Sequence, residues 1–158
     1  MRYRAFSILG ALPIAFSLLT LPVRSASSLA AWSLDSDGVL QLRTLIDTPL
    51  KAFFQSEENE KGVRVWIDFP GELTRPRKLK GSGPVREIRL GKPQKGSTRL
   101  VIEFHPSIEL EPAKLKLVAI SPERWRLKFV GLPTRGLIKI HEGNLTKSSL
   151  SNRKKSKF

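Results

Sequence analysis

The chain has 158 residues, carries 28 Lys or Arg against 14 Asp or Glu for a net charge of +14, and contains no cysteine. This length suits one packed domain with tails rather than several domains. The absence of cysteine excludes a disulfide framework and any cysteine-ligated zinc site.

Residues 1–27 have the pattern of a secretory signal peptide. A basic start, "MRYR", precedes a run without charge over 5–23, and the small residues of "SASSLAA" then allow cleavage near 25–27 or 28–30. An uncleaved membrane anchor is the alternative, because a spanning helix needs roughly 20 apolar residues. Pro13 and the small residues after the run favour cleavage, so we expect export to the periplasm or cell envelope.

The positive charge is unevenly distributed. Three basic residues lie in the signal peptide and five after Thr146, which leaves 20 basic against 14 acidic residues between them. In a cytosolic protein this balance would suggest nucleic acid binding, but export argues against that hypothesis, and we expect no nucleic acid partner. A modest positive field favours instead the polyanions of the envelope, such as cell-wall carboxylates, teichoic acids and lipid head groups.

The mature chain alternates apolar and polar residues with a period of two, which is typical of half-buried β-strands. Eight segments are expected as strands: 30–34, 39–44, 50–55, 63–69, 85–91, 98–104, 114–120 and 124–130. Turn signals separate them, such as "DSDG" at 35–38. Residues 70–84 contain three prolines and three glycines and are interpreted as a connector, not an element.

The pattern also predicts which side chains face the core. The inward residues are expected to be Leu40, Leu42, Val63, Val65, Ile67, Phe69, Val85, Ile88, Leu90, Leu100, Ile102, Phe104, Trp125, Leu127 and Phe129. The outward residues between them include Gln41, Arg43, Arg64, Trp66, Asp68, Arg99, Val101, Glu103, Arg124, Arg126 and Lys128.

Two stretches resemble each other, "RVWIDFPG" (64–71) and "RWRLKFVG" (124–131), and five inward residues of the first four strands recur 60 positions later. We therefore expect an all-β, two-sheet β-sandwich built from two similar four-strand halves, each half a sheet that covers the other. The alternative is that any two β-meanders look alike. The sandwich should span 28–140, and the polar, basic segment 141–158 should be a disordered tail.

Three segments in order resemble the AMIN domain: "RVWIDFPGE" (64–72), "VREIRLGKP" (85–93) and "KGSTRLVIEF" (95–104). That module precedes bacterial cell-wall amidases and occurs in some secretin subunits. The resemblance implies a two-sheet β-sandwich that places envelope proteins on peptidoglycan, without cofactor. It covers about residues 28–140.

In amidases of this family a catalytic zinc domain follows, and here the chain departs from the pattern. Its only histidines are His105, at a strand end, and His141, past the last expected strand. A hydrolytic zinc site usually needs three protein ligands and an open position. We therefore predict neither a metal site nor catalysis, in a free-standing module or the remnant N-terminal part of an amidase.

Outward side chains of the strands are the candidate ligand contacts. An exposed Trp66 beside Arg64 would stack on a sugar while the guanidinium pairs with a carboxylate. Arg43, Arg99 and Glu103 complete the predicted site. The alternatives are that residues 70–84 fold over Trp66 and that the charged faces are merely solvated.

The expected function is non-catalytic binding of peptidoglycan. The second hypothesis is a protein-interaction module that pairs an exposed edge strand with a partner, for example a cell-wall hydrolase or an envelope assembly protein.

Overall fold

The computed structural model describes residues 25–45 and 47–142, and this part of the chain is built from strands. The strands are β1 (Leu29–Leu34), β2 (Val39–Thr44), β3 (Ala52–Gln55), β4 (Arg64–Pro70), β5 (Arg77–Lys80), β6 (Val85–Gly91), β7 (Ser97–Phe104), β8 (Leu115–Ser121), β9 (Arg124–Phe129) and β10 (Ile140–His141). A single 3₁₀ turn, Pro112–Lys114, precedes β8. All eight expected strands are present, which confirms the all-β prediction.

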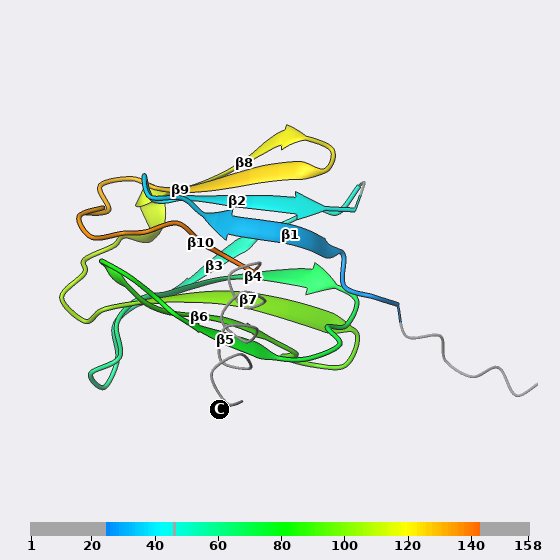
Figure 1. Cartoon of the computed structure of the whole chain (residues 1–158), viewed down its shortest axis with the longest axis horizontal. Helices are drawn as coiled ribbons and strands as arrows, with labels where there is room; N and C mark the ends of the chain where they lie inside the picture. Colours follow the sequence, from blue (N-terminus) through cyan, green and yellow to red (C-terminus); the bar gives the residue numbers. More distant parts are fainter. Residues whose placement is uncertain (1–24, 46, 143–158) are drawn as a thin grey trace, which may run out of the picture.

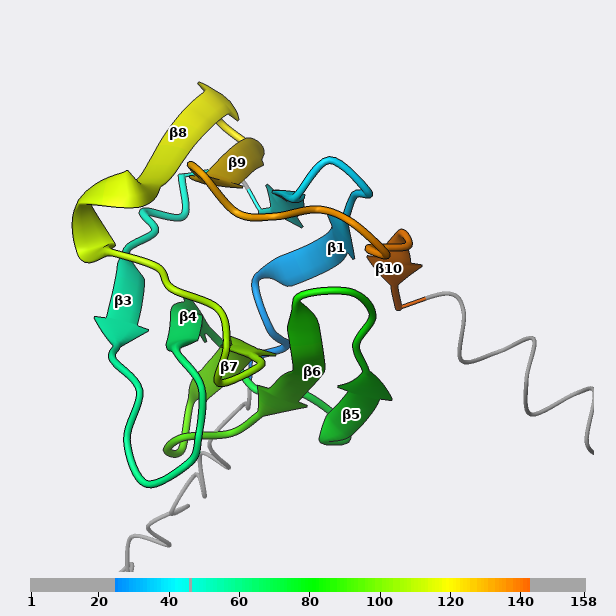
Figure 2. The ribbon, with the colours of Figure 1, turned by 90° about the vertical axis from the view of Figure 1, so that its left-hand side faces the viewer.

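The strands form two antiparallel five-stranded sheets that pack face to face as a β-sandwich (Figures 1 and 2). The upper sheet of Figure 2 has the order β10-β1-β2-β9-β8, and the lower sheet has the order β3-β4-β7-β6-β5. We call them sheet I and sheet II. Because each sheet has one apolar face, stacking the two sheets buries both faces in one core.

The expectation that each half forms its own sheet is wrong. Sheet I takes β1 and β2 from the first half and β8 and β9 from the second, and sheet II takes β3, β4, β6 and β7. The chain crosses between the sheets inside each half, after β2 and again after β7. The two halves are therefore interleaved, and the central ladder of each sheet joins one half to the other.

The internal repeat reappears in the register of these two central ladders. In the β2–β9 ladder Leu40 lies opposite Leu127, and in the β7–β4 ladder Leu100 lies opposite Ile67. Each member of the second pair is 60 positions from a member of the first. The same offset relates the pair Leu42–Trp125 to the pair Ile102–Val65. The repeat thus specifies two equivalent ladders rather than two separate sheets.

Two short strands, β5 and β10, were not predicted from the sequence. Residues 77–80, inside the expected connector, form β5 and pair with β6, and β10 pairs with β1 beyond the last expected strand. His141 therefore lies in a strand, not past it. Both strands are short, and each buries a single apolar side chain, Leu79 or Ile140. One buried residue produces no alternation, so neither segment shows the strand period.

The core lies between the sheets, where the alternation placed it. Every side chain predicted to point inward is buried except Trp125, which is partly buried and packs against the core cluster. Ile67 of sheet II and Leu127 of sheet I are 1% and 0% exposed, respectively. The inward face was thus assigned correctly in the five strands for which it was predicted, 39–44, 63–69, 85–91, 98–104 and 124–130, even though the sheet to which they belong was not.

The predicted signal peptide and basic tail lie largely outside the described residues. The residues next to β1 are held to the sandwich, because the backbone amide of Ser28 donates to the carbonyl of Pro70 at 2.7 Å. Among the residues that the structure describes, no helix has the length and apolar character to cross a membrane.

Candidate functional site

Four of the five predicted site residues come together on the outer face of sheet II. Arg64 and Trp66 lie on β4, and Arg99 and Glu103 lie on the neighbouring strand β7. The register places Arg64 directly opposite Glu103. All four point away from the core, as the alternation predicted.

Trp66 is only partly exposed, because its neighbours on the same face cover it. Its ring stacks on Phe53 of β3 with centroids 5.6 Å apart and an interplanar angle of 14°. The guanidinium carbon of Arg99 lies 5.2 Å from the centroid of the Trp66 ring. Residues 70–84 do not cover this ring, contrary to the alternative considered from the sequence. β5, which lies in that segment, pairs with β6 at the far edge of the sheet.

The charges on this face are largely compensated by one another. Arg99 donates from Nε and one terminal nitrogen to the two carboxylate oxygens of Asp68, at 2.6 and 2.8 Å. This hydrogen bonding raises the pKa of Arg99 above its ordinary value. Glu103 is only 6% exposed and accepts from Arg86 and Arg89 at 3.3 and 3.1 Å. The cations here already hold carboxylates of the protein itself.

Arg43, the fifth predicted residue, lies on the opposite side of the molecule, on the outer face of sheet I. There it stands opposite Arg124 of β9, while Gln41 stands opposite Arg126. On the same face Lys116 of β8 stands opposite Lys128. These five basic side chains are exposed and make no ion pair within the described part of the chain.

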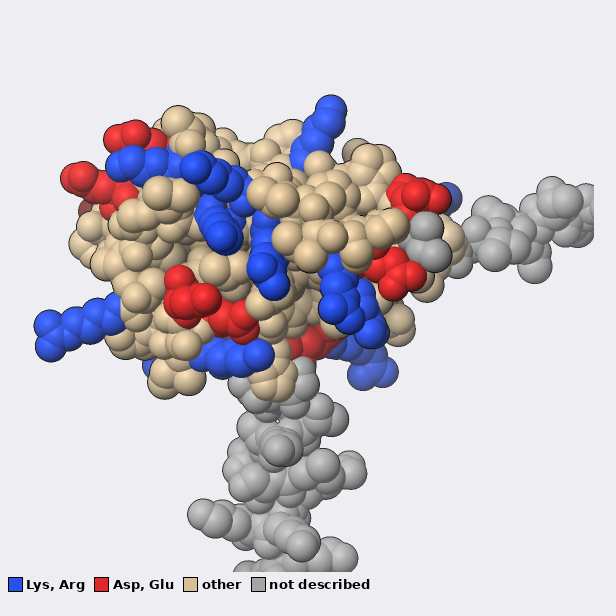
Figure 3. Space-filling model, turned by 90° about the horizontal axis from the view of Figure 1, so that it is seen from above, with Lys and Arg blue, Asp and Glu red and all other residues tan. Residues whose placement is uncertain are grey.

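Because of the 60-residue repeat, the charges on the outer faces of the two sheets can be compared at equivalent ladder positions. Sixty residues separate Arg43 from Glu103, and Arg124 from Arg64. The same pair of ladder positions therefore holds an arginine with a glutamate on sheet II and two arginines on sheet I. Like charges directly opposite each other in a ladder are destabilising. Sheet I thus carries an uncompensated positive face, part of the broken band of Lys and Arg in Figure 3.

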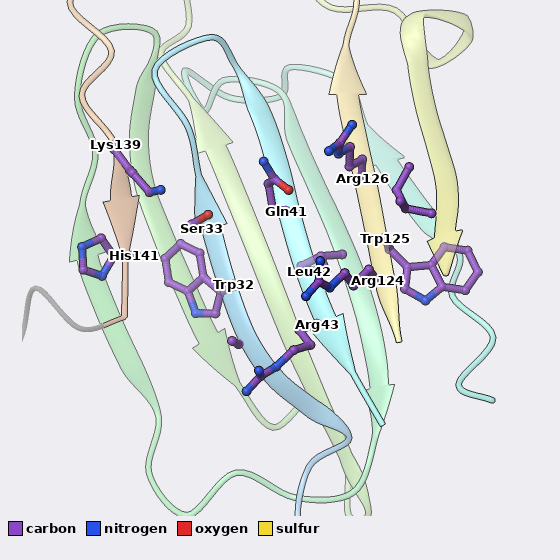
Figure 4. Close-up of a pocket in the computed structure, with 12 residues that line it drawn as sticks. Trp32, Ser33, Gln41, Leu42, Arg43, Arg124, Trp125, Arg126, Lys139 and His141 are labelled. Carbon is purple, nitrogen blue, oxygen red and sulfur yellow. The ribbon is translucent and has the colours of Figure 1, made fainter. Parts of the chain in front are cut away.

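A hollow of about 480 Å³ lies on this face of sheet I. Its lining comes from all five strands or their ends: Ala31, Trp32, Ser33, Gln41, Leu42, Arg43, Ile120, Arg124, Trp125, Arg126, Lys139 and His141. Figure 4 shows the three arginines over β2 and β9, with Lys139 and His141 across β1 from them. The volume falls within the range of roughly 300–1,000 Å³ that is typical of small-ligand sites.

One carboxylate organises the rim of the hollow near the β1–β2 turn. Asp35 accepts from Gln41 Nε2 at 2.7 Å and from the Ser33 hydroxyl at 3.4 Å, and it pairs with Lys139 Nζ at 3.2 Å. Burial raises the pKa of Asp35, but these hydrogen bonds outweigh that effect and hold the pKa below its ordinary value. Lys139 is therefore ion-paired with Asp35, whereas Arg43, Arg124 and Arg126 make no ion pair within the described residues.

Comparison with protein families matches residues 29–129, which span β1 to β9, to the AMIN domain. The chain belongs to the AMIN domain family. The match confirms the resemblance predicted from the sequence and covers more than half of the chain. No curated protein and no solved structure matches the chain.

AMIN domains are non-catalytic targeting modules that are associated with peptidoglycan and typical of envelope proteins. Membership of this family indicates a general, non-catalytic role of the domain in the cell envelope. Among the described residues, no three His, Cys, Asp or Glu side chains come together in the manner of metal ligands. The arginines on the outer face of sheet I are suited to binding anions, because one guanidinium group can donate two parallel hydrogen bonds to a carboxylate or phosphate.

Most of the residues that line the hollow were not predicted from the sequence. Arg124 and Arg126 were predicted to point outward but were not included in the predicted site, because the sequence pattern does not show that Arg124 lies opposite Arg43. Lys139 and His141 had no signal in the sequence, since Lys139 precedes the short strand β10 and His141 is one of its two residues. The 60-residue offset was the available clue: applied to Arg64 and Glu103, it points to Arg124 and Arg43.

Proposed function

We propose that this AMIN domain binds peptidoglycan without cleaving it, and that sheet I provides the principal contact surface. The observation that carries the proposal is the cross-strand pair Arg43–Arg124, two exposed cations in contact positions with no acidic partner in the described structure. A ligand with carboxylates relieves their repulsion. The peptide stems of peptidoglycan carry such carboxylates, and its glycan strands supply the rings that a shallow apolar floor accepts.

The hollow suits a short piece of such a polymer. Arg43, Arg124 and Arg126 lie along one side of it, and the lining also includes Ile120, which is 50% exposed. A guanidinium pairs with a carboxylate through two parallel hydrogen bonds, which fixes both distance and orientation. Because the floor is a flat sheet rather than an enclosed cavity, a long polymer can lie across it.

The outer face of sheet II, with Arg64, Trp66, Arg99 and Glu103, remains the alternative surface predicted from the sequence. A ligand carboxylate there would compete with Asp68 for Arg99 and with Glu103 for its two arginines. That competition lowers the expected gain on binding. The two faces therefore make different predictions for the same assay.

Co-sedimentation with purified, insoluble peptidoglycan sacculi tests the proposal. We expect the purified protein to sediment with sacculi without releasing soluble fragments. The double variant Arg43→Gln/Arg124→Gln should bind roughly five- to thirtyfold more weakly, which corresponds to about 1–2 kcal/mol. The matched control, Arg75→Gln/Lys95→Gln, removes the same charge from exposed positions away from sheet I and should bind like the wild type.

Three outcomes would count against the proposal. Equal weakening of both double variants would mean that net charge alone attracts the wall. Weakening by Arg64→Ala and Trp66→Ala, with Arg43→Gln/Arg124→Gln unchanged, would move the contact surface to sheet II. Absence of sedimentation at low salt would exclude peptidoglycan as the ligand.

The predicted signal peptide places this activity in the periplasm or cell envelope. Support comes from the basic and apolar pattern of residues 1–27 and from the envelope association of AMIN domains. Cell fractionation with an antibody to the folded domain tests it, and recovery in the cytosolic fraction at the full precursor mass would contradict it.

A further inference from the structure

The open edge of β8 differs from the other three sheet edges of the sandwich. β10 has two residues, and β3 and β5 have four each. Three of the four residues of β5 are basic, which is a common protection of an edge against strand pairing. β8 has seven residues, of which only Lys116 is charged. It is the last strand of sheet I and lies at the upper margin of Figures 1 and 2.

The direction of the backbone groups of β8 follows from its ladder with β9. The amide of Val130 donates to the carbonyl of Lys114 at 2.9 Å. The register continues through Lys116–Lys128 and Val118–Arg126. Because hydrogen-bonded pairs alternate in an antiparallel ladder, the even-numbered residues bond to β9. The amides and carbonyls of Leu117 and Ala119 therefore point to the open edge.

The start and end of this open segment are defined. The amide of Leu115 is already used, since it donates to the carbonyl of Pro112. A bulge between Ala119 and Ser121 ends the regular ladder. The run from Leu115 to Ala119 thus offers the carbonyl of Leu115 and both backbone groups of Leu117 and Ala119, enough for a partner strand of about five residues.

The side chains along this edge indicate the chemistry of the partner. On the outer face of sheet I, Lys116 lies on β8 itself, and Lys128, Arg126 and Arg124 lie one strand further in, none of them ion-paired in the described structure. Val118 and Ile120 are 48% and 50% exposed. On the inner side, Leu115 and Leu117 are partly buried against the core. A strand added here has one row of side chains beside cations and the other row beside leucines.

We propose that the β8 edge binds an extended peptide segment of a partner protein in which acidic and apolar residues alternate, and that this segment adds a sixth strand to sheet I. The acidic row pairs with Lys116 and neighbours the arginines, and the apolar row covers Leu115 and Leu117. A second copy of this chain fits less well, because pairing two β8 edges brings two uncompensated basic faces together. The inference concerns a partner protein and does not depend on peptidoglycan binding.

The probe is a labelled synthetic peptide, acetyl-Thr-Glu-Val-Glu-Val-Glu-Thr-amide, titrated with the purified protein at low salt and followed by fluorescence anisotropy. Two control peptides separate the two contributions to binding. One replaces each Glu by Lys and tests the charge. The other carries N-methyl groups on alternate residues, which removes hydrogen-bond donors from one side of the strand without changing the charge. We expect both to bind at least tenfold more weakly than the Glu peptide.

Two protein variants test the same edge. Ala119→Pro removes one amide that points to the open edge and none that bonds to β9, and it should weaken binding about three- to tenfold, while Ala119→Ser should not. Lys116→Glu should weaken binding of the Glu peptide and improve binding of the Lys peptide. Urea unfolding would reveal whether Ala119→Pro disturbs the fold. If it does, the reversed charge preference of Lys116→Glu still tests the proposal.

The outcomes separate this proposal from wall binding. Ala119→Pro should sediment with sacculi like the wild type, because Arg43 and Arg124 are intact. If the N-methylated peptide and Ala119→Pro leave affinity unchanged, the peptide merely contacts the basic face and strand addition is excluded. A wild-type protein that binds no peptide, or a dimer in solution that Ala119→Pro dissolves, would likewise overturn the assignment of this edge to an acidic partner strand.

Discussion

Arg43 of β2 lies directly opposite Arg124 of β9, so two guanidinium side chains occupy positions where cross-strand neighbours contact each other. Nothing in the described part of the chain neutralises either of them. Like charges in such positions destabilise a sheet by roughly 0.2–1 kcal/mol. The pair therefore lowers the stability of the sandwich, while it provides two adjacent cations for an anionic ligand.

We predict that Arg124→Gln stabilises the fold while it weakens binding to sacculi. Urea unfolding should give a free energy of unfolding higher by up to about 0.5 kcal/mol at low salt, and the gain should shrink as salt screens the repulsion. Arg99→Gln is the informative comparison, because it breaks the ion pair with Asp68 and should destabilise the protein. A stability loss in Arg124→Gln would show that this arginine is held by favourable contacts.

The carboxylate of Asp35 should make stability depend on acid pH. Its pKa is lower in the folded protein than in the unfolded chain, so its contribution is fully present above the unfolded value of about 4 and is lost as pH falls through the folded value. Urea unfolding at pH 6, 4 and 3 should show the wild type losing its advantage over Asp35→Asn as the pH falls. Lys139→Gln should reduce the same difference, because it removes one of the groups that lower the pKa. Parallel pH curves for wild type and Asp35→Asn would contradict this role.

The core between the two sheets should be intolerant of truncation at its centre. Ile67→Ala removes a side chain that is 1% exposed and should lower the free energy of unfolding by roughly 2–5 kcal/mol. Ile138 is 70% exposed, so the matched truncation Ile138→Ala should change stability by less than about 0.5 kcal/mol. A loss below that level in Ile67→Ala would mean that the strand register is shifted by one residue.

Features that depend on neighbouring residues in the chain could be predicted from the sequence, whereas features that depend on pairing between distant segments could not. Alternation is a local property, so it placed Ile67 inward and Arg43 outward without knowledge of their neighbours. Sheet membership is decided by pairing between segments far apart in the chain, such as β2 with β9, and alternation contains no information about partners. The same limit hid the site. Arg64 and Arg124 look alike in sequence, and only the ladder shows that one faces Glu103 and the other faces Arg43. The basic face thus became visible only when the register was known.

The two glycines that end the repeated stretches should respond differently to the same substitution. Gly71 and Gly131 both have a positive φ, +83° and +81°, so alanine is strained at each position by about 1–2 kcal/mol. A Cβ at Gly131 would have no atom within 4 Å, whereas a Cβ at Gly71 would collide with the backbone carbonyl of Ala26. Backbone cannot move aside as a flexible side chain can, and overpacking of this kind adds roughly 1–3 kcal/mol. Urea unfolding should therefore show a larger loss for Gly71→Ala than for Gly131→Ala. Equal losses would mean that the segment before β1 is displaced from Gly71 without effect, and that its hydrogen bonds to the end of β4 contribute nothing to stability.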